Sequence, residues 1–269
     1  MVTENINLKS LTGAGSNTPL DKSKALCLLA DALRKNCSYK EAAQKYLNSM
    51  LIDRNNADTY FGLGVCYKNL KMYPKAVKYL EKAAELREDF YQAYFELGLC
   101  HLAEGISCGA IKNFVRAVQI NPDNPEAILH LGLAHESCEE YELALMIYQK
   151  LIENSPRYIK GYENKASLLI KLNRYKEASI LLHQIMKINP DYYRAYMSIG
   201  ICFDKLGKRA DAQRYYRKFL LKKPNSHQAQ FVKTRLERLK NIKSANIPFT
   251  VVSSKATPHE TIRDNLLNK

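Results

Sequence analysis

The feature that most constrains this chain is a sequence pattern that returns every 34 residues. Alanine holds one position of the pattern six times, at Ala42, Ala76, Ala110, Ala144, Ala178 and Ala212. Two further positions hold glycine or proline, at Gly64, Gly98, Gly132, Gly200, Pro122, Pro156, Pro190 and Pro224. Self-similarity at a fixed period of this length predicts a stack of similar units rather than one globular core.

Each period contains the spacing of two amphipathic helices. In residues 57–90, one apolar face consists of Tyr60, Leu63, Gly64 and Tyr67. A second face consists of Ala76, Leu80 and Ala83. Apolar residues at such intervals of three and four form one side of a helix. Glycine within a helix costs about 1 kcal/mol relative to alanine, so we expect it to allow close approach of the paired helix.

The repeating unit resembles the tetratricopeptide repeat. Counting by 34 gives six units, residues 23–56, 57–90, 91–124, 125–158, 159–192 and 193–226. The fifth unit departs from the pattern, because Lys165 and Ala166 replace its leucine and glycine. The resemblance implies an all-α solenoid, which is a superhelix of about six helical hairpins. It also implies that the basic residues 227–243 form a C-terminal capping helix that covers the last hairpin. We predict flexible tails at residues 1–22 and 244–269.

Composition narrows the classes of function. The seven cysteines are odd in number and include no C-x-x-C pair, which argues against a disulfide framework and against a thiolate metal site. No phosphate-binding glycine loop, nucleophile motif or metalloprotease motif is present, so we expect no enzyme, cofactor or metal. The chain also has neither a long apolar run nor a secretory leader pattern. These observations predict a cytoplasmic protein without a membrane span.

The resemblance also implies a concave groove, which the first helix of each unit lines and which receives a peptide. The predicted groove residues are Phe61, Val65, Lys68, Phe95, Leu99, Leu102, Leu129, Leu133, Lys160 and Arg194. Further cations at its flanks are Lys24, Arg34, Lys35, Lys171 and Lys205. The apolar members would form a docking strip, or would instead pack against neighbouring units. This pattern predicts a protein or peptide partner with an apolar centre and acidic ends.

Residues 160–166 are similar to part of the carboxylate clamp that some tetratricopeptide domains use to hold acidic chaperone tails. The likeness keeps Lys160, but Asn164 stands where that clamp has arginine. Two units earlier, Phe95 and Leu99 stand where the clamp has lysine and asparagine. The clamp is therefore incomplete, which argues against a chaperone tail as the ligand. His101 and His135 fall at the aromatic packing position of their units, so we interpret them as core residues.

The alternative function is binding of nucleic acid or an anionic surface through the basic C-terminal end. The chain has a formal net charge of +14, and residues 205–243 hold thirteen basic residues against two acidic ones. The predicted basic patch consists of Arg214, Arg217, Lys218, Lys222, Lys223, Lys233, Arg235, Arg238 and Lys240. Such a patch attracts phosphates by long-range electrostatics. Tyr215, Tyr216 and Phe219 would stack on bases, but their spacing favours core packing. The pattern does not define the oligomeric state.

Overall fold

The structure is a computed structural model, and residues 18–241 are described. Thirteen α-helices and no strand occur among these residues. The helices are α2 (Pro19–Lys35), α3 (Tyr39–Ile52), α4 (Ala57–Asn69), α5 (Tyr73–Leu86), α6 (Tyr91–Ala103), α7 (Ser107–Ile120), α8 (Pro125–Ser137), α9 (Tyr141–Asn154), α10 (Ile159–Lys171), α11 (Tyr175–Ile188), α12 (Tyr193–Lys205), α13 (Arg209–Lys222) and α14 (Ala229–Asn241).

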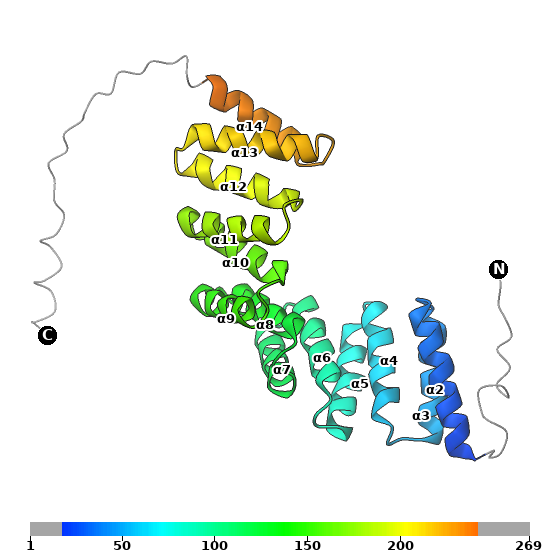
Figure 1. Ribbon diagram of the computed structural model, residues 1–269. Coiled ribbons are helices and arrows are strands. Elements are labelled where there is room, and N and C mark those ends of the chain that lie inside the picture. Colours follow the sequence, from blue (N-terminus) through cyan, green and yellow to red (C-terminus); the bar gives the residue numbers. More distant parts are fainter. Residues whose placement is uncertain (1–17, 242–269) are drawn as a thin grey trace, which may run out of the picture.

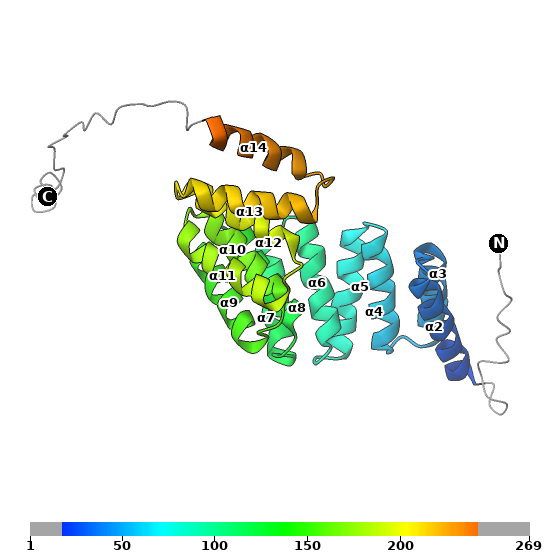
Figure 2. The same ribbon diagram turned by 45° about the horizontal axis from the view of Figure 1, so that its top comes forward.

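The helices pair in chain order into six hairpins, and α14 packs on the last of them, so the predicted fold class is confirmed (Figure 1). The first helices of neighbouring hairpins also touch one another, as α2 touches α4 and α4 touches α6. We call α2, α4, α6, α8, α10 and α12 the inner helices and their partners the outer helices. The direction of the stack changes between the hairpins at its N-terminal end and those at its C-terminal end (Figures 1 and 2).

The glycines of the inner helices lie under large side chains of the outer helices. A Cβ atom at Gly98 would lie 2.6 Å from the ring of Phe114, and one at Gly200 would lie 2.5 Å from the ring of Tyr216. Both rings are almost completely buried. The predicted close approach is therefore made by a ring that lies on the bare backbone, which accounts for glycine within these helices.

One turn geometry ends every inner helix. Among residues 18–241, six residues have positive φ, between 59° and 75°: Cys37, Lys71, Gly105, Glu139, Asn173 and Gly207. They follow one another at intervals of 34 residues. A left-handed residue is a common end to a helix because its N–H bonds back to the last turn. In the first hairpin, for example, the Cys37 N–H donates to the Arg34 carbonyl.

The ends of the solenoid differ from the expected boundaries. Helix α2 begins at Pro19, four residues before the first predicted unit, and Thr18 and Asp21 form a capping box there. The predicted N-terminal tail, residues 1–22, therefore extends into helix, because the counted period takes no account of a capping residue. Helix α14 lies within the predicted capping segment. The predicted tail at residues 244–269 and most of the N-terminal one lie outside the described residues.

Candidate partner-binding face

The predicted apolar strip on the inner helices contributes to the packing between hairpins. Val65 and Leu129 are buried, with 8% and 4% of their surface exposed, and the other apolar members are half-buried. The Phe95 ring centroid lies 5.7 Å from that of Phe114 and 5.4 Å from that of His130. These contacts bring together side chains of α6, α7 and α8. Val65 and Leu129 thus have almost no free surface for a ligand, whereas the other members of the strip keep part of theirs.

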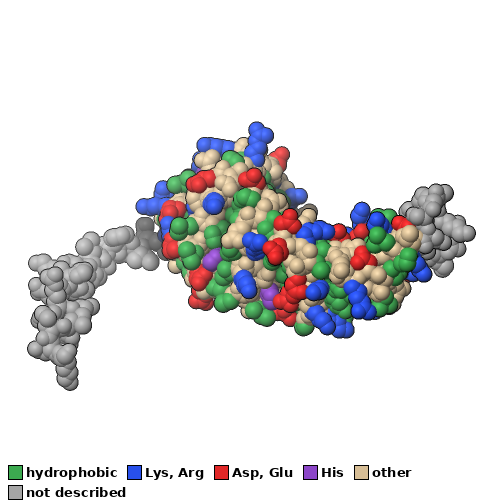
Figure 3. Space-filling view, turned by 90° about the horizontal axis from the view of Figure 1, so that it is seen from below, with side chains coloured by type: hydrophobic (Ala, Val, Ile, Leu, Met, Phe, Trp, Pro, Cys, Tyr) green, Lys and Arg blue, Asp and Glu red, His purple; other side chains and the backbone are tan. Residues whose placement is uncertain are grey.

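The predicted groove cations are paired with acids that the sequence analysis did not identify. Lys68 Nζ lies 2.5 Å from Glu96, and Lys160 Nζ lies 2.9 Å from Glu126. Arg194 pairs in the same way with Glu163, at 3.6 Å. Every pair joins two neighbouring inner helices, and the space-filling view shows acidic and basic side chains interspersed over the surface (Figure 3). These pairs neutralise the cations expected to hold an acidic ligand.

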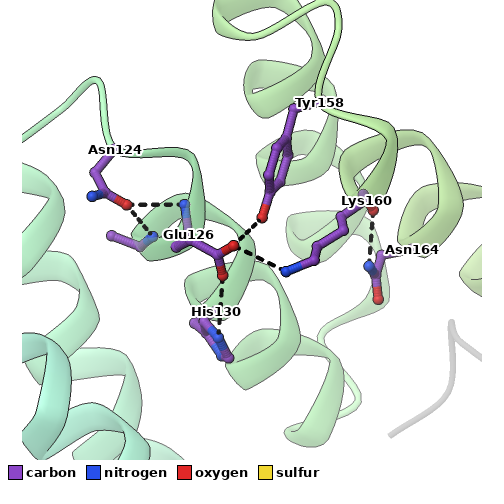
Figure 4. Close-up of polar contacts among 7 residues, drawn as sticks. Asn124, Glu126, His130, Tyr158, Lys160 and Asn164 are labelled. Carbon is purple, nitrogen blue, oxygen red and sulfur yellow. Dashed lines mark hydrogen bonds and ion pairs between the residues drawn. The ribbon is translucent and has the colours of Figure 1, made fainter. Parts of the chain in front are cut away.

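Glu126 is the centre of the polar network drawn in Figure 4. The Tyr158 hydroxyl donates to Glu126 Oε1 at 2.7 Å, and Lys160 Nζ donates to the same oxygen. These bonds hold the pKa of Glu126 below its usual value, whereas burial lowers the pKa of His130, whose Nε2 lies 3.9 Å from Glu126. Asn164 donates to the Lys160 carbonyl, one turn earlier in the same helix. The network is structural, and no carboxylate clamp forms here.

A recess of about 410 Å³ lies at the C-terminal end of the inner face, between α12 and α14. Its lining consists of Ile201, Asp204, Lys205, Tyr216, Gln230, Phe231, Thr234, Arg235 and Arg238. Arg235 and Tyr216 both donate hydrogen bonds to Asp204, and the guanidinium of Arg235 neutralises the charge of that carboxylate. Phe231 is 53% exposed. Neither Lys205 nor Arg238 forms an ion pair with any described residue. The recess therefore combines an apolar surface with two uncompensated cations.

The basic patch around α13 and α14 is only partly free. Arg214 pairs with Asp211, Lys222 with Asp191, and Arg235 with Asp204. Within residues 18–241, no ion pair involves Arg217, Lys218, Lys223, Lys233, Arg238 or Lys240. Tyr215, Tyr216 and Phe219 are 7%, 1% and 0% exposed, so they have no ring face available for base stacking.

The buried cysteines and His135, which could in principle be reactive, have structural roles. The thiols of Cys66, Cys100 and Cys202 are completely buried, and burial raises the pKa of Cys66 to about 11 and those of Cys100 and Cys202 to about 12. His135 lies 2.6 Å from Glu140 at a hairpin tip. Among the described residues, no group of His, Cys, Asp and Glu side chains is placed to hold a metal ion. No described helix has both the length and the apolar character needed to span a bilayer.

Comparison with known proteins agrees with this architecture. The tetratricopeptide repeat model matches residues 57–90, and the model of the coatomer epsilon subunit matches residues 110–244, half of the chain. The chain belongs to the tetratricopeptide repeat family. No curated protein matches it in sequence.

Several solved structures share the fold. PilW, a widely conserved type IV pilus biogenesis factor, is 16% identical with a TM-score of 0.65, over 78% of this chain and 98% of PilW. PilF of Pseudomonas aeruginosa is 16% identical with a TM-score of 0.64, over 81% of this chain and 99% of PilF. YrrB, described as a TPR protein with an unusual peptide-binding site, is 18% identical with a TM-score of 0.58, over 71% of this chain and 99% of YrrB. At these identities the likeness shows the fold alone.

Proposed function

We propose that this protein is a non-enzymatic scaffold that binds a segment of a partner protein on its inner face, in the recess between α12 and α14. One observation carries the proposal: Lys205 and Arg238 line a recess with an exposed aromatic ring, and neither forms an ion pair within residues 18–241, because Asp204 of the same recess pairs with Arg235. Elsewhere on the inner face, Lys68, Lys160 and Arg194 already pair with glutamates of neighbouring inner helices, whereas the flanking Lys24 and Lys35 form no ion pair within residues 18–241. We place the acid-binding end of the groove at its C-terminus, because the unpaired cations there line a recess that also holds an exposed aromatic ring.

The lining defines the chemistry of the ligand. The exposed ring of Phe231 and the side chain of Ile201 provide apolar surface for one aromatic or aliphatic side chain. Lys205 and Arg238 then attract carboxylates next to that anchor. A peptide with one apolar residue flanked by Asp or Glu fits both requirements. The description of YrrB as peptide-binding supports the same class of ligand by fold only.

The test uses a fluorescein-labelled peptide with one phenylalanine between glutamates, and a second peptide with serine in place of the phenylalanine. The Lys205→Glu/Arg238→Glu variant reverses the free charges of the recess. We expect it to weaken binding of the first peptide at least about tenfold, because paired charges at the rim and in the recess contribute on this scale. Equal binding of both peptides, or no binding by the wild-type protein, would contradict the proposal.

The matched control is Lys233→Glu/Lys240→Glu, which makes the same change in charge on the outer surface of α14. We expect this control to retain the peptide, because neither residue lines the recess.

The control also tests the nucleic-acid alternative. Phosphate binding by the whole basic patch would be weakened by both double variants and would fall steeply as salt rises. The cytoplasmic location stays a prediction.

A further inference from the structure

The outer helix α9 presents apolar side chains where most other hairpins present charged ones. Met146 is 67% exposed, and its equivalents in the other five hairpins are Gln44, Lys78, Lys112, Ile180 and Arg214, of which Ile180 is also apolar and 60% exposed. Leu143 is 47% exposed, and its equivalents are Glu41, Lys75, Gly109, Glu177 and Asp211. Charged residues are therefore the most common type at these two positions of the repeat. An exposed apolar pair that replaces it indicates a surface for protein contact.

A recess of about 730 Å³ lies beside these side chains, between α9, α10 and α11. Met146, Leu143 and Lys165 are all among the residues that line it. Lys165 occupies the packing position that holds Leu63, Leu97 or Leu131 in other inner helices, and its Nζ donates to Gln149 of α9 at 2.5 Å. α9 thus offers both a projecting side chain and a hollow next to it.

Two opposite charges of α9 are placed symmetrically about Met146. Glu142 lies four residues before it and Lys150 four residues after it, so the three side chains share one helical face. A two-fold axis at Met146 would place two copies of α9 antiparallel. Each Glu142 would then face Lys150 of the second copy. Lys150 forms no ion pair within residues 18–241, and Glu142, although paired with Arg174, is 77% exposed.

From this self-complementarity we infer that α9 is the two-fold interface of a homodimer. A C2 interface requires one patch to complement itself. Here the flexible Met146 side chain of each copy enters the recess of the other, and two Glu142–Lys150 pairs border the contact. α9 belongs to the outer helices, so the inner face of both copies stays open. Such a dimer presents two partner-binding faces in one particle, which raises the avidity for a partner with repeated segments.

The test is sedimentation velocity on the full chain over a dilution series. We expect a reversible dimer for the wild-type protein. Met146→Glu should raise the dimer dissociation constant at least about tenfold, because it puts two carboxylates at the centre of the contact. Lys112→Gln is the matched control, since it makes the same change in charge at the equivalent position of α7, and it should leave the dissociation constant unchanged.

Charge exchange tests the antiparallel arrangement. Glu142→Lys alone and Lys150→Glu alone should each weaken the dimer, because like charges then face each other. The double variant Glu142→Lys/Lys150→Glu should restore it. Thermal melting of every variant verifies that the hairpin is intact. A wild-type monomer at all concentrations, a dimer that Met146→Glu does not weaken, or a double variant no better than the single ones would each overturn the inference.

Discussion

The ring of Tyr148 lies directly on the backbone of Gly132, so that a Cβ atom at position 132 would lie 2.4 Å from the Cε1 atom of the ring. Gly132→Ala removes a helix penalty of about 1 kcal/mol. Overpacking of the buried ring costs about 1–3 kcal/mol. We therefore expect the variant to lower the free energy of unfolding, measured by urea denaturation.

The fifth hairpin supplies the control for that variant, because it has Ala166 and Leu182 at the two equivalent positions. In a Tyr148→Leu background, Gly132→Ala should cost less than it does alone. A double-mutant cycle measures this difference. A stabilised Gly132→Ala protein, or a cycle without coupling, would contradict the account of why glycine recurs.

Lys165 is the weak point in the packing between the fourth and fifth hairpins. Burial lowers the pKa of Lys165, and among the described residues its ammonium group donates a hydrogen bond only to the neutral Gln149. Lys165→Leu restores the residue of the other hairpins, so we expect the free energy of unfolding to rise by about 1–2 kcal/mol at neutral pH. Because the native state holds the Lys165 proton less tightly than the unfolded chain, this gain should shrink as the pH rises towards 10.5. The exposed control Lys112→Leu should show neither effect.

We predict that the three buried thiols make the folded protein less stable at alkaline pH. The pKa of Cys66 is raised to about 11, and those of Cys100 and Cys202 to about 12, from 9 in the unfolded chain. Above pH 9 the native state therefore holds more protons than the unfolded state, so stability falls as the pH rises towards 12. Each thiol contributes at most about 1.4 kcal/mol per pH unit.

Urea unfolding midpoints at neutral pH and at about pH 10 measure this slope. The triple variant Cys66→Ala/Cys100→Ala/Cys202→Ala should have a shallower slope, whatever it costs in packing. Part of the slope remains, because burial also raises the pKa of tyrosines such as Tyr46, Tyr148 and Tyr216. An unchanged slope in the triple variant would show that these thiols ionise in the native protein.

The hydrogen bond from the Tyr158 hydroxyl to Glu126 makes the stability of the protein depend on pH in the acid range. Tyr158→Phe removes the hydrogen bond to Glu126, so we expect a loss of about 1 kcal/mol at neutral pH. With its pKa lowered, Glu126 stabilises the fold above about pH 4.5, and this contribution is lost as the pH falls through its native pKa. The variant should therefore lose less on acidification than the wild-type protein. Tyr175→Phe is the control, because that hydroxyl contacts only the neutral Asn173.

The 34-residue period was sufficient to predict the fold, because small residues in one register constrain how two helices pack. Ala110 and Ala144 are completely buried, as that reasoning requires. The turn at the end of each inner helix was not predictable from residue type, since Lys71, Glu139 and Asn173 adopt the same left-handed conformation as Gly105. There the repeated geometry of the hairpin overrides the preference of the individual residue.

The candidate site was predicted less well, because position in the repeat does not specify ion pairs between hairpins. Lys68 and Lys160 were predicted to be free groove cations, yet each pairs with a glutamate of a neighbouring inner helix. Glu96 and Glu126 lie 28 and 34 residues from their partners in sequence. A count of charges on neighbouring inner helices would have found them. The recess between α12 and α14 depends on how the capping helix packs, which spacing alone does not define.

The most direct test of the proposed binding face is site-specific photo-crosslinking in cells. A photoreactive phenylalanine analogue replaces Phe231 in the recess or, as the control, Leu221, which is 83% exposed on α13. Mass spectrometry then identifies the crosslinked segment. We expect Phe231 to capture one segment rich in Asp and Glu, and the Lys205→Glu/Arg238→Glu change to abolish that crosslink while Leu221 captures nothing specific. Capture of the same partner from Leu221, or a crosslink from Phe231 that survives the charge reversal, would contradict binding in the recess.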